Sequence, residues 1–224
     1  MRASLRAVCG ALVLSMVASV ALAAGLSKKL KSRIDDASAV LIELHTAPDK
    51  DVPQELWDRA ACVIVIPSLK KAAFVFGGEY GKGLMSCHRN GSWSAPVFMK
   101  LEKGSWGLQI GAQSIDLILL VNNERGMKKL LGNKVTLGAE ASVAAGPVGR
   151  DARAATDAQL NAEILSYSRT QGLFAGINLS GGVLRPDSDD NDDVYGKGVT
   201  ATTILTGNTA APAATQPFMN ALRR

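Results

Sequence analysis

Apolar residues in the first part of the chain recur at the spacing of one helical face. Between positions 27 and 45 these residues are Leu30, Ile34, Ala37, Leu41 and Leu44. Alternating steps of four and three predict an amphipathic α-helix over 27–45, with Ser27 as its N-terminal cap. A turn is expected at 47–50, and Pro53 predicts the start of a second, short helix that ends near Ala60.

From Ala61 onward the pattern becomes typical of β-strands. The run Cys62–Ile66 is rich in β-branched residues, and Pro67 is expected to stop it. A short helix is expected at 123–131, and further strands at 72–76, 84–88, 94–99, 108–110, 114–121, 135–144, 163–168, 173–179 and 199–205. The 22 glycines, many in or between strands, indicate a sharply bent sheet. The predicted fold class is α+β, with a glycine-rich antiparallel β-barrel or sandwich core, an N-terminal amphipathic helix and short flanking helices.

Residues 1–23 have the pattern of a secretory signal peptide. Arg2 and Arg6 precede an apolar run over 8–20, and Ala21-Leu22-Ala23 is a small-x-small cleavage signal. A membrane span needs about 20 apolar residues, so an uncleaved anchor is the less favoured alternative. We expect cleavage before Ala24, export to the periplasm or the cell exterior, one domain over 24–206 and an Ala/Pro-rich tail over 207–224. Within the tail, 207–216 is expected to be flexible, with one docking turn around Phe218 and Leu222.

Charge and cysteine content restrict the function only slightly. The formal net charge is +5, and it becomes +3 when Arg2 and Arg6 leave with residues 1–23. Outside that segment the cysteines are Cys62 and Cys87, which form either a disulfide or two buried thiols. With only two histidines, and at no ligand-like spacing, the sequence predicts no metal site and no cofactor.

The motifs of common enzyme classes are missing from the sequence. It contains no G-x-S-x-G elbow, no H-E-x-x-H and no phosphate-binding G-x-x-x-x-G-K-[ST]. The acidic run 187–193 resembles the opening of a calcium loop, but Gly198 stands where the bidentate glutamate is needed, so a solvated turn is expected. We therefore predict a non-enzymatic protein.

Basic residues gather at the start of the first predicted helix: Lys28, Lys29, Lys31 and Arg33. Cations beside an apolar stripe are typical of a helix that lies at a membrane surface, where the stripe enters the acyl boundary and the cations meet anionic headgroups. The alternative is that the stripe packs on its own domain and the lysines face solvent. Lys70 and Lys71 form a second small basic patch with the same two interpretations.

Several glycine-rich blocks follow one another along the chain. In order, they are Ile66-Pro67, Lys71–Gly78, Gly81-Lys82-Gly83, Gly91–Pro96, Gly107–Gly111, Ser142–Gly149, Tyr167-Ser168, Gly172–Gly176, Asn191 and Tyr195-Gly196. Together these blocks resemble the SYLF-domain family. The resemblance covers about residues 27–206 and implies binding of phosphoinositides and other anionic lipids through a basic segment at the start of the domain. Some eukaryotic members also bind actin filaments. Ala61-Cys62 departs from the lysine-glycine pair of many members.

Two functional hypotheses follow. The first is a peripheral membrane protein that binds anionic phospholipids, and its predicted lipid-binding residues are Lys28, Lys29, Lys31, Arg33, Lys70 and Lys71, with Lys82 and Lys197 as auxiliary cations. The second is a cell-envelope scaffold that binds a protein partner, including actin filaments. Neither hypothesis involves nucleic acid.

Overall fold

A computed structural model describes residues 26–46, 52–73, 76–106, 111–132, 134–148, 161–170 and 173–223. The expected signal peptide, the turn at 47–50 and the strand at 108–110 lie outside the described residues.

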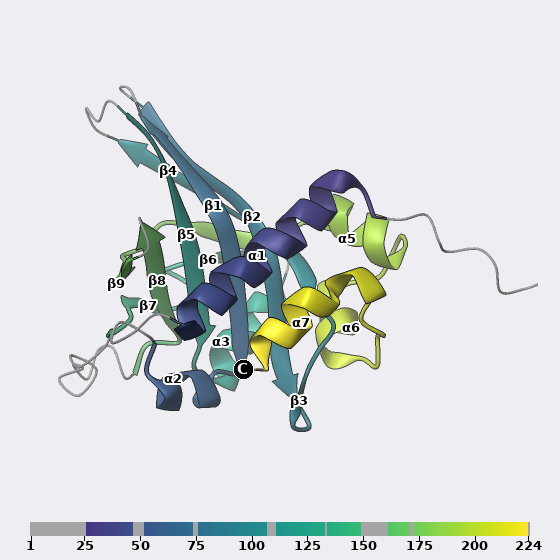
Figure 1. Ribbon diagram of the computed structural model, residues 1–224. Coiled ribbons are helices and arrows are strands. Elements are labelled where there is room, and N and C mark those ends of the chain that lie inside the picture. The colour runs from purple at the N-terminus through teal and green to yellow at the C-terminus, as the bar shows by residue number, and fades with distance from the viewer. Residues whose placement is uncertain are drawn as a thin grey trace, which may run out of the picture.

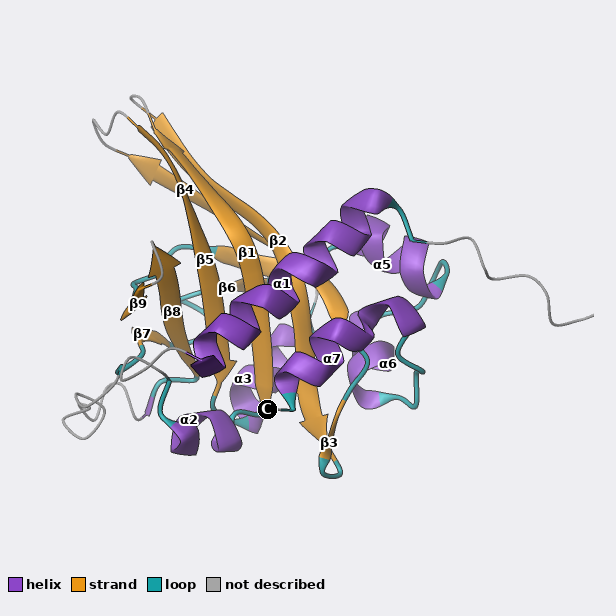
Figure 2. Ribbon diagram, viewed as in Figure 1, coloured by secondary structure: helices purple, strands orange, loops and turns teal. Residues whose placement is uncertain are grey.

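One curled sheet forms the centre of the protein (Figures 1 and 2). Its order is β6-β10-β4-β2-β1-β5-β8-β7, with β3 on β2 and β9 on β8. The strands are β1 (Cys62–Ala73), β2 (Phe76–Arg89), β3 (Ser92–Trp93), β4 (Val97–Trp106), β5 (Gly111–Val121), β6 (Val135–Thr136), β7 (Val143–Ala145), β8 (Ile164–Thr170), β9 (Leu173–Gly176) and β10 (Val183–Pro186). Every pairing between these strands is antiparallel except β7 with β8. The predicted α+β class with a curled antiparallel sheet is confirmed.

Helices cover both faces of this sheet. They are α1 (Lys28–Thr46), α2 (Gln54–Arg59), α3 (Glu124–Leu130), α5 (Ser188–Tyr195), α6 (Ala201–Thr206) and α7 (Gln216–Leu222), with a 3-10 turn η2 (Ala213–Thr215). Apolar side chains of α1, α2 and α7 share one buried cluster with Val63 and Val65 of β1. Side chains of α3 and α6 share the other cluster with Ile64 and Ile66. Because successive strand residues point to opposite faces, the continuous apolar run of β1 contributes to both clusters.

The central strands extend beyond the helices at one end (Figure 1). On the outer side of β4, pairing with β10 ends at Glu102, and on the outer side of β5, pairing with β8 ends at Asp116. We call the remainder the projecting end of the sheet; it comprises residues 70–73 of β1, 76–80 of β2, 102–106 of β4 and 111–114 of β5.

The prediction that Pro67 stops the first strand is wrong, because β1 continues through it to Ala73. The register shifts around Pro67 and Ser68, and Ser68 has a φ of 53°. This bulge brings the backbone of β1 close to β2: a Cβ on Gly83 would lie 1.9 Å from the carbonyl oxygen of Val65. Glycine at this position therefore lets β2 follow the bulged strand.

The disulfide alternative holds for the two cysteines. Cys62 and Cys87 are direct register partners on β1 and β2, and a disulfide joins them. Both are buried against the side of the sheet that α3 and α6 cover.

Several sequence-based elements need correction. The expected strand at 199–205 is helix α6, because the Thr200 side chain caps the segment by accepting a hydrogen bond from the Thr203 N–H at 3.1 Å. In place of one strand over 135–144, the structure forms the two short strands β6 and β7. The strand expected over 173–179 ends at Gly176. Thr215 in the expected flexible stretch is buried, and the docking turn around Phe218 is the buried helix α7 on α1.

Candidate functional site: a basic cleft beside helix α1

Helix α1 buries its apolar stripe within the domain. Leu30, Ile34 and Leu41 are at most 2% exposed and belong to the cluster shared with the sheet and α7. Of the two interpretations of this helix, packing on its own domain is the one that the structure shows. The stripe is therefore not available to enter an acyl boundary, and only the other side of α1 faces outward.

The four basic residues of α1 lie in two environments. Lys28, Lys29 and Lys31 are exposed and make no ion pair within the described residues. Arg33 is only 7% exposed and pairs with Asp190 of α5, and its guanidinium carbon lies 5.9 Å from the centre of the Phe98 ring. Arg33 was predicted to act with the surface lysines, whereas it lies inside the protein and links α1 to α5.

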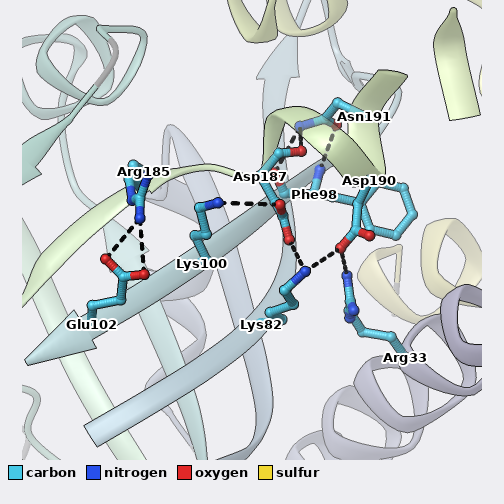
Figure 3. Close-up of polar contacts among 9 residues, drawn as sticks. All are labelled: Arg33, Lys82, Phe98, Lys100, Glu102, Arg185, Asp187, Asp190 and Asn191. Atoms are coloured by element: carbon cyan, nitrogen blue, oxygen red, sulfur yellow. Dashed lines mark hydrogen bonds and ion pairs between the residues drawn. The ribbon is translucent and has the colours of Figure 1, made fainter. Parts of the chain in front are cut away.

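Asp190 belongs to a buried network of ion pairs (Figure 3). Lys82 of β2 contacts both Asp187 and Asp190, the latter at 3.0 Å. Lys100 of β4 reaches Asp187 at 3.4 Å, and Arg33 completes the chain at Asp190. Three cations thus face two carboxylates. The network carries one excess positive charge, and it lies between the sheet, α1 and α5.

The network shifts the proton affinities of its members. Burial alone would raise the pKa of Asp190, but the hydrogen bonds that it accepts from Arg33 and Lys82 outweigh burial and hold that pKa well below its usual range. Burial would lower the pKa of Lys82, yet hydrogen bonds to Asp187 and Asp190 and their negative charges raise it. Asp190 and Lys82 therefore both stay charged at neutral pH.

The acidic run 187–193 is not the solvated turn that the sequence predicted. It forms helix α5, and both Asp187 and Asn191 are buried. The Asn191 amide donates to the Phe98 carbonyl oxygen at 2.9 Å and accepts from the Phe98 N–H at 2.9 Å. Asn191 therefore continues the hydrogen bonding of β4 where β10 ends, and this holds the two aspartates over Lys82 and Lys100.

An open cleft of about 380 Å³ lies between α1 and the strands β1 and β2. Its lining residues are Lys29, Ser32, Arg33, Asp36, Pro67, Ser68, Lys70, Tyr80, Gly81 and Lys82. Lys70 is exposed and makes no ion pair in the described part of the chain, and Tyr80 is 45% exposed. The bulge at Ser68 is fixed by Asp116, whose carboxylate accepts from the Ser68 N–H at 3.0 Å. We call this the basic cleft.

The basic cleft brings together some of the predicted residues and not others. Lys29 of α1 and Lys70 of β1 line it from two sides. Lys71 points to the opposite face of the sheet and pairs with Glu79 at 3.3 Å. Sequence reasoning named Lys82 only as an auxiliary cation and missed Lys100 and Tyr80. No short-range pattern marks these three residues as neighbours of α1.

The described residues show neither a metal site nor a membrane-spanning helix. No group of three or more His, Cys, Asp or Glu side chains in the described ranges is arranged to hold a metal ion. Within the part of the chain that the structure describes, no helix combines the length and apolar character that crossing a membrane requires.

The fold and the cleft define an α+β domain built around one curled sheet, with a basic surface beside its first described helix. A family model described as "Ysc84: Las17-binding protein actin regulator" matches residues 102–224, which is more than half of the chain. The chain therefore belongs to the Ysc84 family, the SYLF-domain family that the sequence blocks resemble. All six predicted lipid-binding residues precede the matched segment.

Curated relatives agree with this assignment. An SH3 domain-containing protein of Schizosaccharomyces pombe is 38% identical over 164 residues, which are 71% of this chain and 38% of that protein. LAS seventeen-binding protein 3 of Saccharomyces cerevisiae is 31% identical over 204 residues, 87% of this chain and 44% of its own length. SH3 domain-containing YSC84-like protein 1 of Homo sapiens is 30% identical over 191 residues, 82% of this chain and 56% of its own. The chain thus spans 38 to 56% of the length of these relatives.

Proposed function

We propose that this protein is a non-enzymatic domain that binds anionic lipid headgroups at a membrane surface through the basic cleft and the exposed lysines of α1. One observation carries the proposal: Lys29 and Lys70 are 41 positions apart in the sequence, yet both line one open cleft. Ser68 also lines the cleft, and its hydroxyl can donate to a phosphate or carboxylate oxygen.

The surface cations set the expected strength of binding. Lys28, Lys29, Lys31 and Lys70 are exposed and form no ion pair with any described residue. A lysine near an anionic membrane contributes about 1 kcal/mol, so four contribute about 4 kcal/mol, roughly a thousandfold in affinity. Arg33 and Lys71 are left out of this set because carboxylates of the protein already neutralise them. Binding is therefore electrostatic and weakens with salt.

We also propose that the protein acts outside the reducing cytosol. The disulfide between Cys62 and Cys87 supports this location, because such bonds persist in oxidising compartments. Processing before Ala24 is the corresponding proposal for the N-terminal segment. Mass spectrometry of protein recovered from the periplasm or medium tests both, and an intact Met1 together with free thiols at Cys62 and Cys87 would refute them.

Co-sedimentation with lipid vesicles tests the lipid proposal. The protein is mixed with vesicles that are neutral, generally anionic, or contain phosphoinositide, at low and at physiological salt. The test variant changes Lys28, Lys29, Lys31 and Lys70 to Gln. The control variant removes the same charge from other exposed positions: Arg59, Arg125, Lys128 and Arg223.

Binding to anionic vesicles that the test variant loses and the control variant retains supports the proposal. Equal losses in both variants would assign binding to net charge alone and refute the basic cleft as the site. Absence of binding by the native protein to every anionic vesicle would refute the lipid function itself.

A protein partner is the second candidate, and the family description favours it. The matching model is described as a Las17-binding actin regulator, and one relative is named as a LAS seventeen-binding protein. Co-sedimentation with actin filaments in the absence of lipid tests this function. If the four-lysine variant pellets with filaments as the native protein does, actin binding belongs to a surface other than the basic cleft.

A further inference from the structure

The projecting end of the sheet is little covered: its Lys70–Tyr80 row faces α1 across the basic cleft, and its β4 side faces Lys134 and Arg185 across a second open cleft. On one face Tyr80 is 45% exposed, and Cβ atoms built on Gly78 and Gly104 meet at most one atom within 4 Å, at 3.8 Å. On the other face Gln113 is exposed, and Lys71 and Lys103 are partly exposed. No helix among the described residues covers either face at this level (Figure 1). The ends of β1, β2, β4 and β5 thus extend past the core, and no described apolar layer packs against them there.

Both edges of the projecting end are open within the described residues. Along β4 the ladder with β10 ends at Glu102, where β10 turns away at Gly181 and Gly182. Along β5 the ladder with β8 ends at Asp116. The backbone groups of residues 103–106 and 111–115 on these outer sides therefore meet no strand that the structure describes. Water or a polar layer must satisfy them.

The charge around this end is positive. Glu102 is held by Arg185 through two contacts of 2.9 Å, and Glu79 is held by Lys71. Lys70 remains without an ion pair in the described part, and Lys103 reaches only the Asn178 carbonyl oxygen, at 3.5 Å. This surface therefore complements a layer of negative charge.

The dimensions of the projecting end match the polar layer of a bilayer. Lys70 and Tyr80 are register partners, and three further residue pairs lead to the Ala73–Gly77 pair. At about 3.3 Å per residue, the sheet extends about 10 Å beyond the Lys70 row. An amphipathic segment at a membrane surface lies about 5–10 Å deep in the boundary of headgroups and acyl chains.

We propose that the projecting end of the sheet enters the interfacial layer of an anionic bilayer end-on, with Lys70 and Tyr80 at the level of the headgroups. This inference rests on the proposed lipid function and adds an orientation and a second contact surface to it. A tyrosine with an exposed ring and hydroxyl suits the headgroup level. The open edges limit the depth, because unpaired backbone groups are satisfied among headgroups and water but not in hydrocarbon.

Hydrogen exchange with bound vesicles provides the first test. Amides of residues 100–106 and 111–115 are expected to exchange more slowly on anionic vesicles, whereas the amides of α6 are unchanged. The second test changes the charge of the face without altering its packing. Gly104→Asp places a carboxylate where a Cβ meets no atom within 4 Å, and Gly104→Asn adds the same shape without charge.

Gly104→Asp is expected to weaken vesicle binding roughly fivefold, while Gly104→Asn binds like the native protein. Urea denaturation confirms that both variants are folded. Native-like binding by Gly104→Asp, or slower exchange confined to α1, would refute the end-on orientation while the lysine variants still test the lipid function. A dimer that Gly104→Asp dissociates would instead assign the projecting end to a second copy of the chain.

Discussion

The buried ion network offers the sharpest test of the energetics, through the substitution Asp187→Asn. Asp187 is 1% exposed and faces Lys82 and Lys100. Among the described residues, the substitution leaves Asp190 to pair with Arg33 and Lys82, and it removes the carboxylate that Lys100 contacts. Removing one partner of a buried pair costs about 3–5 kcal/mol. The lysines retain exposures of 20% and 16%, so we expect the lower end, a loss of about 3 kcal/mol in the free energy of unfolding.

An exposed ion pair in the same protein provides the matched control. Arg185 and Glu102 are 39% and 41% exposed, so Glu102→Gln is expected to cost at most about 1 kcal/mol. Urea denaturation at pH 7, with the disulfide intact, measures both variants against the native protein. If Asp187→Asn costs no more than Glu102→Gln, the network does not hold α5 on the sheet, and our account of its burial is wrong.

Further predictions address pH, the disulfide and the bulge. The depressed pKa of Asp190 contributes stability that is complete above the unfolded-state pKa of about 3.9 and is lost as the pH falls toward the folded-state value. Asp190→Asn should therefore be less stable than the native protein at pH 7, with a gap that narrows below about pH 4 in urea titrations; a gap independent of pH contradicts this. Replacing Cys62 and Cys87 by Ala opens a link across 25 positions and should cost about 3 kcal/mol; an unchanged melting temperature contradicts it. Gly83→Ala should cost at least about 2 kcal/mol, because its Cβ meets the Val65 carbonyl oxygen, while Gly104→Ala stays within about 0.5 kcal/mol; equal costs would remove the steric explanation of Gly83.

Periodic patterns predicted the elements whose fold depends on local sequence. The apolar stripe of α1 and the capped helix α3 appear within one or two residues of their expected bounds. Failures occurred where distant contacts decide the outcome. Pro67 was expected to end a strand, yet β1 continues because β2 and β5 pair with it on both sides of the bulge.

The candidate site was predictable only in part, for the same reason. Exposed lysines at the start of α1 follow from the helical period alone. The partner of Arg33 is 157 positions away, and no local pattern predicts that pairing. The acidic run was interpreted as a solvated turn because it lacks the glutamate of a calcium loop, whereas the neutral member, Asn191, attaches it to β4.

The packing of α7 on α1 has a consequence for how the chain reaches its final form. These helices come from opposite ends of the described chain, and Phe218 and Leu222 of α7 are at most 1% exposed in the cluster that α1 completes. When the chain emerges from its N-terminal side, during synthesis or translocation, the apolar side of α1 is fully covered only after residues 216–222 have emerged. The nascent domain therefore exposes this apolar surface until α7 has emerged. We expect it to depend on a holding chaperone until then.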